Sequence, residues 1–312
     1  MERKLTIFTS PKPFDDALIA TIQRNAIGSW IHQACEVEVM LIGDEIGMAQ
    51  AAHDLGVRHL TGVEKNEHGT PLINSIFSIA DQEASNSLLA YINADILLLD
   101  DFLPAVRRSA DRFDRFMMVG QRWDLDLDSE LSFESGWARA MREQLETSGM
   151  LHPPAGSDYF VFPRGQFGRL PPFALGRAGW DNWMIFNARR LVVPVIDATQ
   201  SITVVHQNHD YRHLDGGEPH YRLPESCKNV ELGGGPETVF TLADANWRLN
   251  GHGLRRTRMS ASGLRRWIEA AAIARLGPGR RLRLVHALFH PIETARWLWT
   301  QALGGVTGGA AE

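Results

Sequence analysis

An aspartate stands inside the most apolar stretch of the chain. The segment SLLAYINADILLLDDFL covers residues 87–103, and Asp95 follows Asn93 within it. An unpaired carboxylate is costly among apolar side chains, so we expect Asp95 to face a metal ion, a cationic side chain or a strand end that is open to solvent. The simpler alternative is a strand that ends at Asn93 and turns at Asp95.

A second carboxylate lies in a tryptophan-rich motif. Asp181 follows Trp180 in the sequence AGWDNW, after a turn that contains glycine. Partial desolvation raises the pKa of a carboxylic acid, and indole faces can stack against a sugar. These properties favour Asp181 as a general base and Trp180 as a binding surface. The alternative is that Asp181 caps the helix that begins there.

Four of the twelve histidines lie within fifteen residues. His206, His209 and His213 follow the pattern H-x-x-H-x-x-x-H, and His220 comes seven positions later. A zinc site is the weaker interpretation, because no cysteine joins them and no strong helical pattern holds their spacing. One histidine could instead ligate a metal or contact a phosphate, and purely structural histidines are the alternative.

Two further positions carry polar groups beside apolar strands. Arg122 and Trp123 end the run FMMVGQRW, where a guanidinium can clamp a phosphate and an indole can stack on a sugar. Asp158 precedes the apolar run YFVF, so we expect it to face a second substrate. The simpler alternatives are an aromatic residue at the edge of the core and an ordinary turn residue.

The elements that must position these side chains alternate between strand and helix over residues 1–100. The β-rich runs cover residues 4–10, 36–44, 57–60 and 87–93. The helical patterns between them cover residues 15–34, 48–55 and 70–84. This alternation predicts right-handed βαβ units and a mostly parallel sheet, in which ligands bind outside the carboxyl ends of the strands. The polar residues at those ends are Thr9, Ser10, Asp44, Asn93 and Asp95.

The alternation weakens after residue 100. Helical patterns cover residues 104–114, 129–150 and 179–191. Strand patterns cover 115–123, 157–163 and two short runs within 192–211. The Gly- and Pro-rich stretch 214–236 is predicted as a loop.

Taken together, the ordered motifs of residues 4–212 resemble the GT-A family of nucleotide-sugar glycosyltransferases, in particular its family 2-like members. In that family an apolar strand ends in an Asp-x-Asp motif that holds a divalent cation on the donor's diphosphate, and Asn93-Ala94-Asp95 stands in that place. The resemblance implies an α/β fold of GT-A type, which is a Rossmann-like, mostly parallel sheet flanked by helices. Because Asn93 replaces the first carboxylate, Asp95 is the one firm carboxylate ligand of the motif.

The resemblance also implies a role for each candidate residue. Asp181 matches the catalytic base. The donor would be bound by Thr9, Ser10, Asp44, Asn74, Asn93 and Asp95. The acceptor would be bound by Trp123, Asp158 and Trp180. The metal would be held by Asp95 and His209, with His206 as the alternative, and the expected cofactor is Mn²⁺ or Mg²⁺, which use few protein carboxylates alongside phosphate.

The activity implied is transfer of a sugar from a nucleotide-diphosphate donor, with a UDP-sugar as the first guess, to a hydroxyl of a glycan or lipid-linked acceptor. Transfer with inversion and a role in polysaccharide biosynthesis are expected. A catalytically weak sugar-nucleotide or glycan-binding scaffold is the alternative, because of Asn93. A sugar nucleotidyltransferase is less favoured, because FTSPKPFDD lacks the glycines of a phosphate loop.

The charge distribution divides the 312 residues unevenly. Residues 1–254, interpreted as a nucleotide-binding half (1–100) and an acceptor half (101–254), carry a net charge of about −12, whereas residues 255–312 carry about +7. In this Arg-rich helical extension Leu264, Trp267, Ile268 and Ala271 share one helical face. That face could pack on the domain or lie on an anionic membrane surface. No nucleic-acid partner is expected, because the catalytic part is acidic and no recognised module is present.

Cysteine usage and the amino terminus complete the expectations. Cys35 and Cys227 lie in no disulfide or zinc-finger spacing, which favours a reducing compartment. The start MERKLTIFTSPKPF lacks the apolar stretch of a secretory signal, and charged residues interrupt the longest apolar run. A cytoplasmic protein is predicted, with a peripheral position on the inner face of the membrane as a refinement.

Overall fold

Residues 4–33, 37–209, 220–257, 261–276, 285, 287–289 and 291 are described by the computed structural model. Cys35, His213 and most of residues 277–312 lie outside this part of the chain, as do the tryptophans beyond residue 291. Cys227 is an exposed free thiol.

Alternating strands and helices build the first 100 residues, as the sequence predicts. The strands are β1 (Leu5–Thr9), β2 (Val37–Ile42), β3 (Arg58–Leu60) and β4 (Leu88–Ile92). The helices between them are α1 (Ala17–Ile31), α2 (Met48–Leu55) and α3 (Ile73–Glu83). Asp16 caps α1 by accepting a hydrogen bond from the Ile19 backbone N–H at 2.9 Å. β1 pairs in parallel with both β2 and β4, so the carboxyl ends of β1 and β4 lie side by side.

The rest of the chain extends this sheet and builds a second one. Its strands are β5 (Ile96–Leu98), β6 (Met117–Val119), β7 (Trp123–Leu125), β8 (Met150–Leu151), β9 (Tyr159–Pro163), β10 (Val195–Asp197), β11 (Val204–Gln207), β12 (Trp247–Asn250) and β13 (Gly253–Arg256). Its helices are α4 (Phe102–Arg112), α5 (Trp137–Ser148), α6 (Trp180–Arg190), α7 (Pro224–Gly233) and α8 (Ala261–Leu276). Short 3-10 turns cover His220–Arg222, Pro236–Thr238 and Leu242–Asp244.

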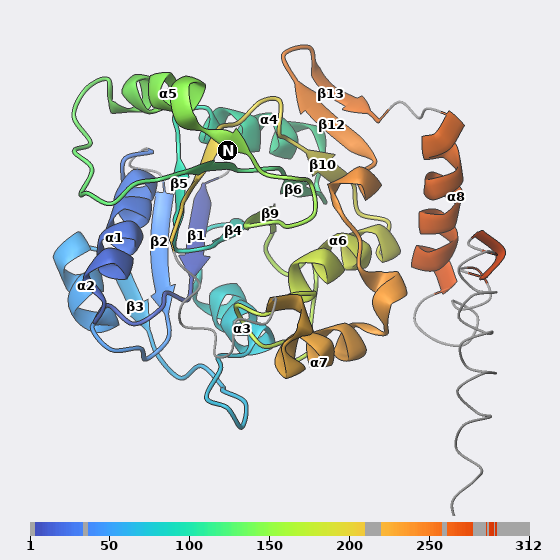
Figure 1. Ribbon diagram of the computed structural model, residues 1–312, viewed down its shortest axis with the longest axis horizontal. Helices are drawn as coiled ribbons and strands as arrows, with labels where there is room; N and C mark the ends of the chain where they lie inside the picture. The colour runs from blue at the N-terminus through green and yellow to red at the C-terminus, as the bar shows by residue number, and fades with distance from the viewer. Residues whose placement is uncertain are drawn as a thin grey trace, which may run out of the picture.

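The main sheet has nine strands in the order β13-β12-β10-β6-β9-β4-β1-β2-β3 (Figure 1). Among the described strands of this sheet, only β9 and β13 run against their neighbours, so the predicted α/β fold with a mostly parallel sheet is confirmed. Side chains alternate between the two faces: Phe8 packs with α3 and α6, whereas Leu5 and Ile7 pack with α1 and α4. Helices therefore cover both faces.

A smaller sheet in the order β5-β11-β7-β8 lies beside the end of β4. The sequence predicts β5 only as a continuation of the apolar run, and the strand predicted over residues 115–123 is divided into β6 and the start of β7. The chain turns after Ile92 and re-enters a strand at Ile96, and β11 pairs His206 with both Ile96 and Asp124. This register brings the late histidines to the end of β4.

One predicted loop is a helix. Residues 214–236 read as loop because of their glycines and prolines, but α7 occupies Pro224–Gly233. Pro224 takes the first turn, where its missing N–H costs nothing, and Gly234 ends the helix with a φ of 106°. Here these residues begin and end a helix, so the loop prediction is wrong for this stretch.

Helix α8 packs on the body of the protein, beyond α6 (Figure 1). Its buried positions are Glu269, Ala270, Ile273 and Ala274, and Arg266 pairs with Asp244 at 2.8 Å. The predicted apolar face is only partly covered: Trp267 is 44% and Ile268 45% exposed, and both line a pocket between α8 and the end of α6. The boundary predicted after residue 254 falls inside β13. No helix among the described residues is long and apolar enough to cross a membrane.

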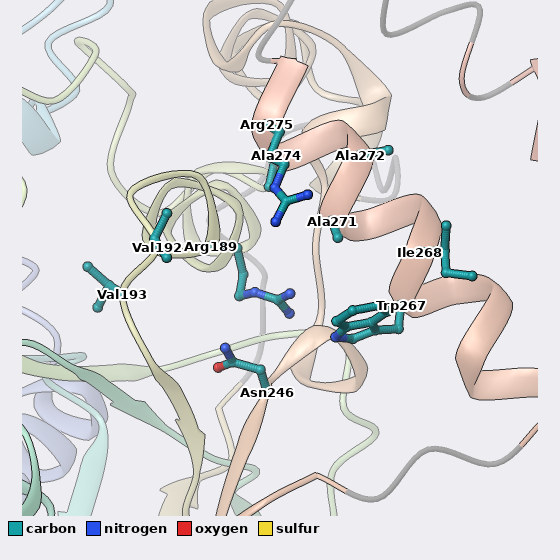
Figure 2. Close-up of a pocket in the computed structure, with 10 residues that line it drawn as sticks. All are labelled: Arg189, Val192, Val193, Asn246, Trp267, Ile268, Ala271, Ala272, Ala274 and Arg275. Atoms are coloured by element: carbon teal, nitrogen blue, oxygen red, sulfur yellow. The ribbon is translucent and has the colours of Figure 1, made fainter.

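A shallow pocket of about 320 Å³ lies between α8 and the end of α6. Figure 2 shows the Trp267 indole lying toward Arg189 and Asn246. Val192, with a φ of 57° and 86% exposed, lines the same pocket. The pocket therefore joins exposed apolar side chains of α8 to those that follow α6.

Candidate active site

A cavity of about 580 Å³ opens at the carboxyl ends of β1 and β4. Its volume lies within the range of small-molecule sites, and its place is the one expected for ligands of an open α/β sheet. Seven of the predicted site residues line it: Ser10, Asn93, Asp95, Asp158, Trp180, Asp181 and His209.

Asp95 meets two histidines in this cavity. Its Oδ2 lies 3.2 Å from Nε2 of His209 and 3.7 Å from Nε2 of His206. One ligand atom from each of the three residues lies within 4.8 Å of the others. Asp95 Oδ1 is buried and has no hydrogen-bond partner among the described residues. A carboxylate with an unmet oxygen beside two imidazoles fits a divalent cation, so both late histidines are candidate ligands together with Asp95.

The backbone around Asp95 is held by Gln207. The backbone N–H of Gln207 donates to the Asp95 carbonyl at 3.1 Å, and its side-chain Nε2 donates to the same carbonyl at 3.2 Å. Gln207 is fully buried and its side chain is bonded in turn to Asn25 on α1. The turn that presents Asp95 is therefore fixed from two sides.

Electrostatics keep Asp95 ionised. Burial by itself would raise its pKa, but the contact with His209 and the charges of His206 and Lys12 outweigh burial, so the pKa of Asp95 lies well below its ordinary value. An ionised carboxylate is the form that binds a cation.

Asn93, in the first position of the motif, is engaged by the protein itself. Its Oδ1 accepts a hydrogen bond from the Tyr91 hydroxyl at 3.0 Å, and its Nδ2 donates to Asp158 Oδ1 at 3.0 Å. A carboxylate could not donate the second bond and would face Asp158 with a like charge. The amide at this position is explained by its neighbour Asp158.

Arg122 forms ion pairs with two carboxylates near the candidate metal ligands Asp95, His206 and His209. It donates to Asp158 at 2.6 Å and to Asp124 at 2.8 Å, and both carboxylates hold its pKa above the ordinary value despite burial. Asp124 also lies 2.7 Å from His152 Nδ1 and 3.2 Å from His206 Nδ1. Asp124 therefore lies near the ring of His206 on the side opposite to Asp95, although Nδ1 of His206 makes no hydrogen bond among the described residues.

Asp181 lies in the first turn of α6. Gly179, with a φ of 103°, is the residue before the helix, so the alternative of Asp181 as the capping residue is wrong. Its Oδ2 accepts a hydrogen bond from the Ser157 backbone N–H at 3.3 Å. Burial raises the pKa of Asp181 to about 6, against weaker opposing hydrogen bonds. The group is thus mostly ionised at neutral pH and basic enough to take a proton.

Trp180 lines the wall of the cavity but offers little exposed ring surface for stacking. It is 4% exposed, and its ring packs edge-to-face against Tyr91 at 5.1 Å and Phe160 at 5.7 Å. Trp183, the other indole of the motif, donates to the Gly233 carbonyl and does not line the cavity.

Four predicted residues do not line the cavity. Thr9 is fully buried within β1, and Asp44 is exposed beyond β2, where it accepts from Gly62 at 3.4 Å. Asn74 lies in α3. Trp123 packs against the apolar cluster around Leu125, so Arg122 faces the cavity in its place.

The sequence analysis assigned no role to several residues that line or support the cavity. Lys12, His152 and Arg177 line the cavity, and Asp124 and Gln207 support it. Lys12 follows β1 at the predicted ligand end, which was an available signal. The roles of the other four depend on strand pairing and loop contacts that local pattern does not carry.

Among the comparisons with known proteins, only the one with solved structures found proteins similar to this chain. No family model matches the chain, and no curated protein matches it. Glucosyl-3-phosphoglycerate synthase from Mycobacterium tuberculosis, in complex with Mn²⁺, UDP and phosphoglyceric acid, is 15% identical with a TM-score of 0.46, over 75% of this chain and 80% of that chain. The mannosyltransferase PcManGT from Pyrobaculum calidifontis, in complex with GDP-Man and Mn²⁺, is 14% identical with a TM-score of 0.42, over 68% and 59%. Each match covers most of this chain at low sequence identity.

Proposed function

We propose that this protein is a glycosyltransferase that moves a sugar from a nucleotide-diphosphate donor to a hydroxyl of an acceptor. The observation that carries the proposal is the content of one cavity: a carboxylate with two histidines suited to a divalent cation, and a second carboxylate with a raised pKa. A cation held by Asp95 and the histidines can stabilise the charge of a departing diphosphate. Asp181 can remove the proton of an acceptor hydroxyl.

The two halves of the domain contribute different parts. Asp95 comes from residues 1–100, whereas His206, His209 and Asp181 come from residues 101–254. When bound at Asp95 and the two histidines, a divalent cation supplies positive charge to the diphosphate. Two imidazoles favour a transition metal such as Mn²⁺ over Mg²⁺, which is bound mainly through oxygen.

The proposed reaction is a single displacement with inversion. Asp181 accepts the proton of the acceptor hydroxyl while the oxygen of that hydroxyl attacks the anomeric carbon of the donor sugar. The bond between that carbon and the donor phosphate oxygen breaks, and its electron pair stays on the diphosphate. The backbone N–H of Ser157 donates to one oxygen of Asp181 and helps to keep the carboxylate in place.

Release of free nucleotide from a panel of nucleotide sugars, UDP-sugars first, tests the proposal with and without Mn²⁺. We expect one donor to be turned over in Mn²⁺ and turnover to fall at least 100-fold in Asp95→Ala. Asp111→Asn, a change on the exposed side of α4, is the control. Binding of a donor without turnover would favour the scaffold alternative, which the engaged amide of Asn93 supports. No binding at all would contradict both.

We also propose that the exposed apolar and basic side chains of α8 contact an anionic membrane, where a lipid-linked acceptor would be available. Leu264, Trp267, Ile268 and Leu276 are each more than 40% exposed, and Arg265 and Arg275 lie among them. Aromatic and basic side chains on one exposed helix face suit a lipid interface.

Vesicle binding of the full chain tests this membrane contact. Truncation near Gly253 would remove most of β13 and the core residues of α8, so substitutions are preferable. We expect flotation with phosphatidylglycerol vesicles to fall in the double variant Trp267→Ser, Ile268→Ser and to persist in Tyr221→Ser, which removes an exposed aromatic ring elsewhere. Equal flotation of both variants would contradict the proposal.

A further inference from the structure

Lys12 is a cation of the cavity that the proposed reaction has not yet used. It lies in the loop after β1, lines the cavity and interacts electrostatically with Asp95. Burial lowers its pKa, and Asp95 opposes that effect. Among the described residues no carboxylate lies within ion-pair distance of Lys12, whereas the cavity's arginines are paired: Arg122 with Asp124 and Asp158, and Arg177 with Glu225.

The backbone at Lys12 is held in place before any ligand binds. Its N–H donates to Gln23 Oε1 at 2.7 Å, and its carbonyl accepts from Gln23 Nε2 at 3.0 Å. Gln23 is 2% exposed on α1, so this pair of bonds is shielded from water. Pro11 and Pro13 flank Lys12, and a residue before proline is restricted to extended conformations. A half-buried lysine that lines the cavity without an ion-pair partner among the described residues, on a backbone that is already held in place, suits an anionic ligand.

We propose that Lys12, positioned by Gln23, binds a phosphate of the donor diphosphate beside the cation site. The assignment rests on the proposed function for the identity of the ligand, but the anion site itself does not require turnover. A cation held by a single carboxylate keeps a net positive charge, and Lys12 adds to it where the diphosphate gains negative charge as the sugar leaves. Part of the electrophilic assistance is therefore built into the chain and remains when the metal is removed.

Binding of pyrophosphate and of UDP by the full-length protein in excess EDTA tests this site by calorimetry. We expect both ligands to bind without metal, and both affinities to fall at least tenfold in Lys12→Met. Lys228→Met, which removes the same charge from an exposed surface pair with Glu231, is the matched control and should change them less than twofold. Failure of the native protein to bind in EDTA, or equal binding by Lys12→Met, would overturn the proposal.

Gln23 is a positioning residue, and its role is separable from packing. Gln23→Met keeps the length of the side chain but removes both bonds to the Lys12 backbone. We expect a two- to fivefold loss of pyrophosphate affinity that disappears when the comparison is made in the Lys12→Met background, because Gln23 acts through Lys12. An equal loss in both backgrounds would show that Gln23 affects the cavity in another way.

A measurement on the unmodified protein covers the case in which a variant does not fold. Pyrophosphate should protect Lys12 from acetylation by acetic anhydride, read by peptide mass spectrometry, and leave Lys228 unprotected. Absence of protection would refute the site. Protection at Lys12 without turnover of any nucleotide sugar would instead leave the anion site standing and reject the glycosyltransferase proposal. A phosphorylated acceptor as the true ligand would show as an effect of Lys12→Met on acceptor KM with unchanged UDP binding, which also overturns the assignment to the donor.

Discussion

The pH dependence of turnover tests the role of Asp181 directly. Its pKa is raised to about 6 by burial, so about one tenth of the molecules hold an ionised Asp181 at pH 5 and about nine tenths at pH 7. A general base must be ionised, so kcat/KM should rise about tenfold between these pH values at saturating Mn²⁺. With an unshifted carboxylate the same interval would change the rate by less than about one tenth.

Removal of the base should cost much more than a change of pH. Asp181→Asn keeps the shape of the side chain and its place in the first turn of α6, but it cannot accept the proton. General-base catalysis contributes about 10²- to 10⁴-fold, which corresponds to about 3–5 kcal/mol of transition-state stabilisation. The remaining activity should also lose the rise near pH 6, because the titrating group is gone.

The assay is release of nucleoside diphosphate from the donor identified in the panel, with initial rates measured from pH 5 to 8. Asp111→Asn on α4 serves as the control and should keep both the rate and the pH profile of the native protein. Asp181→Asn with turnover within threefold of native, or with an unchanged inflection near pH 6, would refute the assignment of the base.

Three further outcomes follow from the geometry. His206→Ala should weaken Mn²⁺ binding at least tenfold in titration calorimetry, and equal affinity would remove His206 from the ligand set. Asn93→Asp should lower the free energy of unfolding by about 1–3 kcal/mol at pH 7, because it places a carboxylate about 3.0 Å from Asp158. The like charge raises the pKa of one carboxylate of this pair in the folded state, so the loss should shrink as the pH falls through that pKa, and a loss constant with pH would count against it. Arg266→Met should lower the free energy of unfolding by about 1–3 kcal/mol in urea titrations, since Asp244 and Glu269 stay buried after losing their ion pairs with Arg266, which is itself 39% exposed. A change below 0.5 kcal/mol would show that α8 does not depend on this pairing.

Local pattern was sufficient for the strands and helices up to the end of β4 at Ile92 and for singling out Asp95. Strand and helix signals alternate there because each βαβ unit is built from neighbouring segments, and β1, α1, β2 and β4 lie where the sequence predicts them. The cost of a carboxylate inside an apolar run singled out Asp95 without any structure. Asp181 was identified by the same kind of reasoning, from its indole neighbours.

Contacts between residues far apart in the sequence could not be predicted from local pattern. Asp124 and His206 are 82 positions apart, and only the register of β7 against β11 places them side by side. The hydrogen bonds that hold the Lys12 backbone come from Gln23 on the next helix. The orientation of α8 depends on the ion pair between Arg266 and Asp244. Interactions of this kind leave no periodicity in the sequence, because the partners are chosen by the packing of distant elements.

The sequence by itself determined the α/β fold class, the alternation of elements and the chemistry of the residues that end the strands, since these follow from hydrophobic period and from the cost of burying charge. Only the tertiary structure decided that both histidines join Asp95, that the amide of Asn93 serves Asp158, and that the apolar face of α8 stays partly exposed. Each of these outcomes depends on distances between segments far apart in the chain, which the pairing of strands and the packing of helices establish.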